Sequence, residues 1–105
     1  MREKTTARKI QKLLDKLVEN PQDTETRLAL GKLYFLDSQF EEAVGCYRKL
    51  LEVEPRNVSG YYNLAVALTA QKKMEEAKEA FQKVLELDPD NKGAQEELAK
   101  LVSFR

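Results

Sequence analysis

Among the residues of this chain whose type and spacing could do chemistry are two pairs of adjacent glutamates at equivalent places of the sequence. Closely spaced carboxyl groups can serve as a general acid and a general base. Glu41-Glu42 and Glu75-Glu76 stand 34 residues apart, and each pair falls at the start of an expected helix. The helix macrodipole favours negative charge at that place. We therefore interpret both pairs as helix-opening residues rather than as catalytic ones.

Other residues that could carry chemistry are few. The chain has no histidine and a single cysteine, Cys46. It therefore lacks the commonest general base, and it cannot build a Cys/His metal site or an internal disulfide. Cys46 stands next to Tyr47 in an expected helix and is interpreted as a structural, partly buried thiol. Because no glycine-rich phosphate loop, Walker or EF-hand pattern occurs either, we expect no enzymatic activity, no catalytic residue, no metal and no cofactor.

The composition is typical of one small folded domain. The 105 residues are 42% hydrophobic and 34% charged, with a formal net charge of zero, and this balance gives no reason to expect nucleic acid or an anionic membrane as a partner. The basic residues among the first twenty are interleaved with acidic ones and favour a solvated helix face. Because no apolar run suits a transmembrane helix or a signal peptide, we expect a cytoplasmic protein without membrane insertion.

An internal repeat must position all of these residues. The prolines of the chain lie at equal intervals of 34 residues: Pro21, Pro55 and Pro89. Proline cannot continue a helix and disfavours helix in the residue before it. Two positions after each proline comes a good helix N-cap: Asp23, Asn57 or Asn91. Each site therefore ends one helix and starts the next, and a shift of 34 also aligns residues 39–43 with 73–77 and residues 47–53 with 81–87.

This pattern resembles the tetratricopeptide repeat, a 34-residue helix–turn–helix unit with conserved small and aromatic packing positions. In residues 24–57 the packing positions hold Leu30, Gly31, Tyr34, Ala43, Tyr47 and Pro55. In residues 58–91 they hold Tyr61, Leu64, Ala65, Leu68, Ala77, Phe81 and Pro89. The sequence departs from the family pattern at Arg27, where tryptophan is usual, at Ala65, where glycine is usual, and at Leu68, where an aromatic is usual. The turns inside the repeats also lack the common glycine.

The resemblance implies an all-α, right-handed superhelix of antiparallel helix pairs. We expect a single domain, 1–105, with six helices at about 5–19, 23–36, 40–53, 57–70, 74–87 and 91–103. Around the two repeats, residues 5–22 form an N-terminal capping helix or half repeat, and residues 92–105 form a C-terminal capping helix. Phe104 either folds back on the core or belongs to a truncated next repeat.

Function in this family lies on the concave face, which implies that the partner is a protein or a peptide. The helical spacing predicts these groove residues: Glu25, Leu28, Lys32, Phe35, Leu36, Ser59, Tyr62, Asn63, Val66 and Thr69. Ala29, Ala70, Glu96 and Lys100 could add to them. Several of these side chains are apolar beyond the needs of the core, and exposed apolar patches often mark binding surfaces. The alternative is that Leu28 and Val66 simply pack between neighbouring helices.

One subclass of the family holds a C-terminal carboxylate in a clamp of Lys, Arg and Asn side chains. Asn63 matches one clamp residue and could bind the backbone of an extended peptide. The other clamp positions hold Leu28, Lys32, Gly93 and Glu97. We therefore expect an apolar ligand segment rather than a charged tail, bound with an affinity on the order of micromolar.

Two alternatives to a peptide-binding adaptor stay open. The first is self-assembly, with a homodimer as one form, through the apolar stripe Ile10–Val18 or through Phe104, because short repeat arrays leave their end faces open. The second is that the chain is a segment of a larger tetratricopeptide scaffold whose function lies elsewhere.

Overall fold

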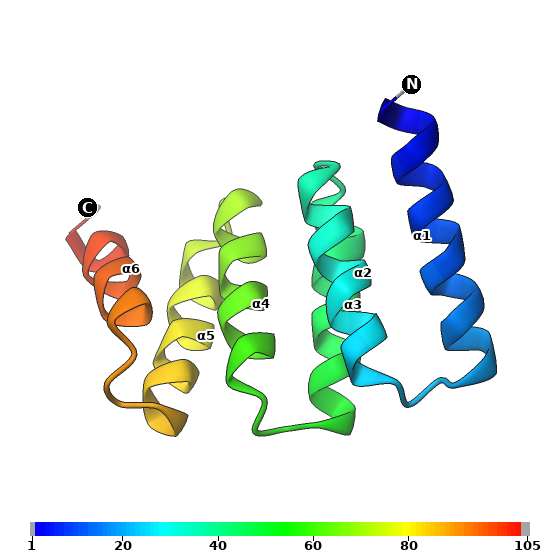
Figure 1. Ribbon diagram of the computed structural model, residues 1–105. Helices are drawn as coiled ribbons and strands as arrows, with labels where there is room; N and C mark the ends of the chain where they lie inside the picture. Colours follow the sequence, from blue (N-terminus) through cyan, green and yellow to red (C-terminus); the bar gives the residue numbers. More distant parts are fainter. Residues whose placement is uncertain (1, 104–105) are drawn as a thin grey trace.

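All elements that the structure describes are α-helices. The computed structural model describes the backbone of residues 2–103 and the side chains of residues 5–103, so Phe104 lies outside the described residues. The helices are α1 (Arg2–Glu19), α2 (Thr24–Leu36), α3 (Phe40–Val53), α4 (Val58–Ala70), α5 (Met74–Leu87) and α6 (Lys92–Ser103). They run side by side in sequence order, with α1 and α6 at opposite ends of the molecule (Figure 1). The expected all-α helical array is confirmed, and only the first helix begins earlier than the sequence indicated.

The residues that follow the prolines cap the helices as expected. Asp23 accepts a hydrogen bond from the backbone N–H of Thr26 (3.1 Å), which satisfies one of the unpaired donors at the start of α2. The Asn57 side chain accepts from the Gly60 N–H at 2.8 Å. Asn91 accepts from the Ala94 N–H at 2.9 Å. These local bonds fix where α2, α4 and α6 begin.

The turns inside the repeats adopt a left-handed backbone without glycine. Ser38 has φ of 60° and Lys72 has φ of 63°. After Ser38 the chain is held by a hydrogen bond from the Gln39 N–H to the Tyr34 carbonyl (2.8 Å), and after Lys72 the same bond runs from Lys73 to the Leu68 carbonyl (2.9 Å). The turns therefore keep the geometry that glycine usually provides, with a side chain that disfavours it.

Small residues let the two helices of each repeat cross closely. Ala43 and Ala77 are fully buried at the crossings of α2 with α3 and of α4 with α5. Gly31 has no room for a side chain, since a Cβ there would lie 2.5 Å from Cε1 of Tyr47. The residues predicted to pack the repeats are buried at Leu30, Gly31, Ala43, Tyr47, Leu64, Ala65, Leu68, Ala77 and Phe81, half-buried at Tyr34 and Tyr61, and exposed at Pro55 and Pro89.

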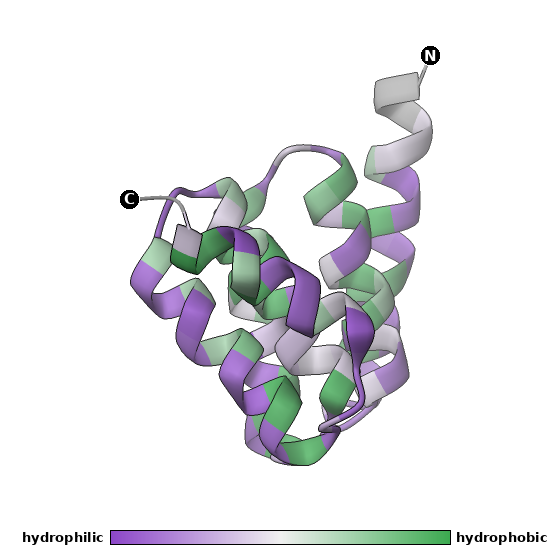
Figure 2. Cartoon of the chain, turned by 90° about the vertical axis from the view of Figure 1, so that its left-hand side faces the viewer, coloured by the Kyte–Doolittle hydropathy of each residue, from purple (hydrophilic) through white to green (hydrophobic). Residues whose placement is uncertain are grey.

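The repeats are joined by packing of α3 and α5 on the helices that follow them. Gly60 on α4 packs against the side chains of Leu50 and Leu51 on α3. An ion pair between Arg48 and Glu76 (2.9 Å) links α3 to α5, but both side chains are half-exposed, so its contribution to stability is small. Hydrophobic and hydrophilic residues are interspersed along the helices (Figure 2). Among the described residues, none of the helices has the length and apolar character to span a membrane.

Candidate functional site

The predicted groove residues lie on α2 and α4 and fall into two groups by exposure. Exposed are Glu25, Lys32, Leu36 and Ser59; half-buried are Leu28, Phe35, Tyr62, Asn63, Val66 and Thr69. Leu28 and Val66 pack against the hydrophobic core with part of their surface and remain exposed with the rest. Leu28 and Val66 therefore both pack between helices and expose apolar surface.

Tyr62, one of the predicted groove residues, packs between helices. Its ring meets Phe81 of α5 edge to face, with centroids 5.5 Å apart and an interplanar angle of 78°. Its hydroxyl end lies against α6, because a Cβ at Gly93 would come 2.9 Å from the Tyr62 hydroxyl oxygen. Tyr62 thus fills the space between three helices, and truncation of this side chain would disturb packing as well as any ligand contact.

Two aromatic rings are in contact across the turn between α2 and α3. The ring of Phe35 lies 5.2 Å from that of Phe40 with a tilt of 57°. This contact, together with packing on the core, explains why Phe35 is half-buried. Its neighbour Leu36 has no such cover and is 79% exposed. An isolated exposed leucine is ordinary, but this one lies beside further apolar surface on α1 and α2.

Two polar side chains among the predicted groove residues form hydrogen bonds within their own helix, α4. Asn63 donates from Nδ2 to the Ser59 carbonyl at 2.8 Å. The Thr69 hydroxyl donates to the Ala65 carbonyl at 2.8 Å. An asparagine amide carries two N–H donors and a carbonyl oxygen. The bond to Ser59 therefore engages one Asn63 donor and fixes the orientation of the amide.

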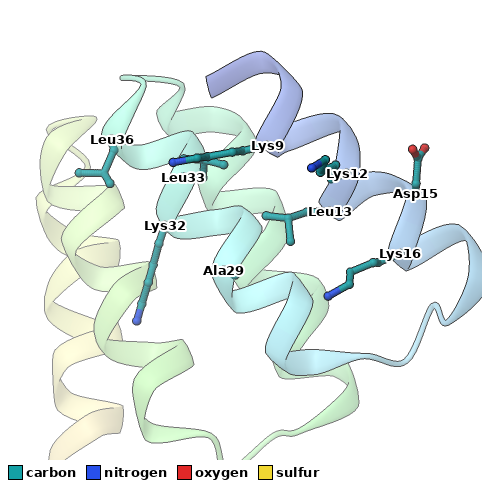
Figure 3. A pocket seen from close by; sticks show the side chains of 9 residues that line it. All are labelled: Lys9, Lys12, Leu13, Asp15, Lys16, Ala29, Lys32, Leu33 and Leu36. Carbon is teal, nitrogen blue, oxygen red and sulfur yellow. The ribbon is translucent and has the colours of Figure 1, made fainter. Parts of the chain in front are cut away.

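A cleft lies between α1 and α2, and it takes in Ala29, Lys32 and Leu36, which the helical spacing assigned to the groove. It has a volume of about 740 Å³ and is lined by Lys9, Lys12, Leu13, Asp15, Lys16, Ala29, Lys32, Leu33 and Leu36. Leucine side chains from both helices lie within it, and the lysines surround them (Figure 3). We call this feature the α1/α2 cleft. Its lysines are exposed, as expected of the basic N-terminal segment, but they border an apolar surface rather than a featureless face.

The paired glutamates and the cysteine lie on α3 and α5. Glu41, Glu42 and the second glutamate pair are exposed in the first turns of α3 and α5. Cys46 is buried, and this burial raises the pKa of its thiol to about 11. Burial also raises the pKa of Tyr47 well above its usual range. Among the side chains that the structure describes, no three His, Cys, Asp or Glu residues are grouped so that they could hold a metal ion.

Comparisons with known proteins agree with this architecture. A family model described as tetratricopeptide repeat matches residues 58–91, and one described as TPR repeat matches residues 31–72. A search of curated proteins gave no match. Solved structures of low identity resemble nearly the whole chain, and at this identity they show the fold alone.

Three of these structures illustrate the similarity. The first TPR of Spaghetti (RPAP3), bound to the HSP90 peptide SRMEEVD, is 24% identical with a TM-score of 0.88, over 96% of this chain and 80% of that one. The second TPR domain of human RPAP3, in complex with the HSP70 peptide SGPTIEEVD, is 24% identical with a TM-score of 0.87, over 96% and 84%. The Arabidopsis OM64 TPR domain is 18% identical with a TM-score of 0.88, over 99% and 86%.

Proposed function

Because this chain belongs to the tetratricopeptide repeat family, we propose that it is a non-catalytic protein-interaction module. It holds a short apolar segment of a partner protein on the face that α2, α4 and α6 contribute. The observation that supports this proposal is the partial exposure of Leu28, Tyr62 and Val66 on two neighbouring helices. Fixed, half-buried apolar side chains bind a ligand with little loss of their own conformational entropy.

The chemistry of the groove favours an apolar ligand over an acidic tail. The similar RPAP3 domains are in complex with peptides that end in EEVD. Of the positions where a carboxylate clamp would place its residues, this chain has Leu28, Gly93 and Glu97 at three. Glu97 would repel an acidic tail, and Leu28 cannot donate a hydrogen bond to one. Asn63 remains suited to the backbone of an extended segment.

Peptide selection on the purified chain tests the proposal. Peptides are selected from a random phage-displayed library, and the affinity of one selected peptide is measured by fluorescence anisotropy. Ser59→Arg places a bulky charge on the exposed groove side of α4 and should weaken binding at least tenfold. Glu52→Arg places the same side chain at an exposed position of α3 and serves as the matched control.

The two variants compare the predicted groove side of α4 with an exposed position on α3. Loss of binding in Ser59→Arg with unchanged binding in Glu52→Arg supports the groove. Equal binding in Ser59→Arg and the wild type, or failure to select any peptide, contradicts it. Tyr62→Ala is less suitable as a test, because Tyr62 also packs on Phe81 and Gly93.

A further inference from the structure

Some apolar residues of α1 and α6 are exposed, although the equivalent residues of the interior helices are buried. Residues 34 apart occupy equivalent places in this repeat. Tyr47 and Phe81 are 2% and 1% exposed, whereas their equivalent on α1, Leu13, is only half-buried. On α6, Val102 is 52% exposed, whereas its equivalent on α4, Leu68, is 1% exposed. In this chain α1 and α6 therefore each expose part of a face that the equivalent interior helices bury.

The exposed faces of α1 and α6 are complementary in type. α1 precedes a proline turn and has the pattern of a second helix, and α6 follows one and has the pattern of a first helix. The α1/α2 cleft lies where the first helix of a preceding repeat would pack. Leu33 lines this cleft and is half-exposed. The equivalent residue on α4, Ala67, is fully buried.

We propose that α6 of a second copy of this chain occupies the α1/α2 cleft. α6 of one copy and α1 of the next then form a split repeat, and the two copies join head to tail into one longer superhelix. This self-association is separate from the proposed peptide binding, and a different experiment tests it. The similarity of nearly the whole chain to solved tetratricopeptide structures supports the geometry, because α1 and α6 are included in the superposition.

Side-chain size fits at the centre of the split repeat. In the first repeat Gly31 faces Tyr47, and no Cβ can be accommodated between them. In the split repeat the equivalent positions hold Ala99 and Leu13. The larger alanine is thus matched with the smaller leucine, so the sum of the two volumes is kept close to that of an interior pair. Ala99 is exposed in the single chain and its equivalent Ala65 is fully buried.

Charge also favours head-to-tail contact. Residues 5–19 hold four basic and two acidic side chains, and residues 74–103 hold eight acidic and four basic ones. The acidic excess belongs to α5 and to the turn before α6, because α6 itself is balanced, with Lys92 and Lys100 against Glu96 and Glu97. Attraction between the basic α1 and this acidic region speeds their encounter and weakens with added salt. A like-end contact, α1 to α1, would bring together the lysines of two clefts.

One residue limits the strength of this contact. Lys9 stands at the crossing position that Ala43 and Ala77 hold in the interior repeats. A long side chain there must turn aside before the second helix can approach, at a cost in conformational entropy. The association is therefore weak and reversible in the wild type. Lys9→Ala should strengthen it at least tenfold, which is the opposite of what a purely charge-driven site for an acidic partner predicts.

The contact is heterologous, because α1 and α6 are different surfaces at opposite ends of the molecule (Figure 1). Heterologous contacts form open chains of copies unless the rotation between copies closes a ring. Sedimentation velocity of the full chain, from micromolar to millimolar concentration, should therefore show an average mass that rises without stopping at a dimer. Added salt should lower it.

Two variants break opposite sides of the same contact. Leu33→Glu charges the cleft, and Ala99→Glu charges the exposed face of α6. Each should weaken self-association at least tenfold. An equimolar mixture should restore association as a 1:1 dimer only, since each variant keeps one intact end. Circular dichroism shows whether Leu33→Glu is folded. If it is not, Lys16→Glu, which also charges the cleft but lies at an exposed position, is used instead.

Val18→Asp is the control, because Val18 is 80% exposed on α1 but outside the cleft, and it should associate like the wild type. A wild type and Lys9→Ala that remain monomeric at all concentrations overturn the proposal. So does a mixture of Leu33→Glu and Ala99→Glu that stays monomeric. A dimer that does not grow further points to a symmetric contact and overturns it as well. Binding of an acidic helical peptide to a monomeric wild type would assign the cleft to another partner.

Discussion

The ring of Tyr47 lies directly on Gly31, so close that a Cβ at Gly31 would come within 2.5 Å of Tyr47 Cε1 and 2.8 Å of Cζ. The contact brings α2 and α3 together at the centre of the first repeat. It is made by the ring itself rather than by the flexible end of a side chain, and Tyr47 is 2% exposed, so neither partner can move without opening the core.

Gly31→Ala should therefore destabilise the protein despite the better helix propensity of alanine. We expect the free energy of unfolding to fall by about 1–3 kcal/mol, as overpacking does. Chemical denaturation measures the change. Gly45→Ala is the matched control: it lies in α3 with no atom within 4 Å of its Cβ position, and it should stabilise by up to about 1 kcal/mol. Stabilisation by Gly31→Ala would contradict the close contact.

A second prediction concerns the turns inside the repeats. Ser38 and Lys72 hold left-handed backbone conformations with φ of 60° and 63°. Glycine removes a steric cost of about 1–2 kcal/mol at such a position but adds about 0.5–1 kcal/mol of unfolded-state entropy. Lys72→Gly should thus raise the melting temperature modestly. Glu79→Gly, at an exposed position within α5, should lower it. A lower melting temperature for Lys72→Gly would speak against the turn geometry.

The helix caps give a third prediction. Asn57→Ala removes the acceptor for the Gly60 N–H and should lower the free energy of unfolding by about 1 kcal/mol. Lys73 occupies the same place before α5 but makes no side-chain cap bond. Lys73→Ala should therefore change stability much less. Urea denaturation measures the free energy of unfolding of both variants. Equal decreases in the two would contradict a specific role for the Asn57 cap.

A fourth prediction follows from two carboxyl groups. The Thr26 hydroxyl and N–H lower the pKa of Asp23, and hydrogen bonds from Thr24 and Asn57 lower the pKa of Glu54. A lowered folded-state pKa stabilises the fold above the unfolded-state pKa and loses this effect as pH falls through the folded-state pKa. Stability should thus decline as pH falls below about 4. Glu54→Gln should flatten part of that decline, and an unchanged profile would contradict the assignment.

The fifth prediction concerns Cys46, whose burial raises the pKa of its thiol to about 11. Only the thiolate reacts readily, so the native protein should be alkylated by iodoacetamide far more slowly than an unfolded control at pH 8. Mass spectrometry over time gives both rates. Equal rates in folded and unfolded protein would show that Cys46 is accessible and would contradict its role as a core residue.

The sequence alone determined the helices of this protein, because helix ends depend on nearby residues. Prolines end helices by lacking an N–H, and Asp23, Asn57 and Asn91 start them by capping the chain three residues on. The 34-residue interval then determined which helices pair. Small residues at Gly31, Ala43 and Ala77 indicated the crossings, since a crossing requires them.

Only the tertiary structure decided how much of each side chain is covered. The helical period placed Leu28, Tyr62 and Val66 on one face, but it could not tell that all three are half-buried or that Tyr62 packs on Phe81. It also did not distinguish the cleft from an ordinary solvated face of α1. Exposure depends on the distance between helices far apart along the chain, and that distance is set by the packing of whole repeats rather than by local sequence.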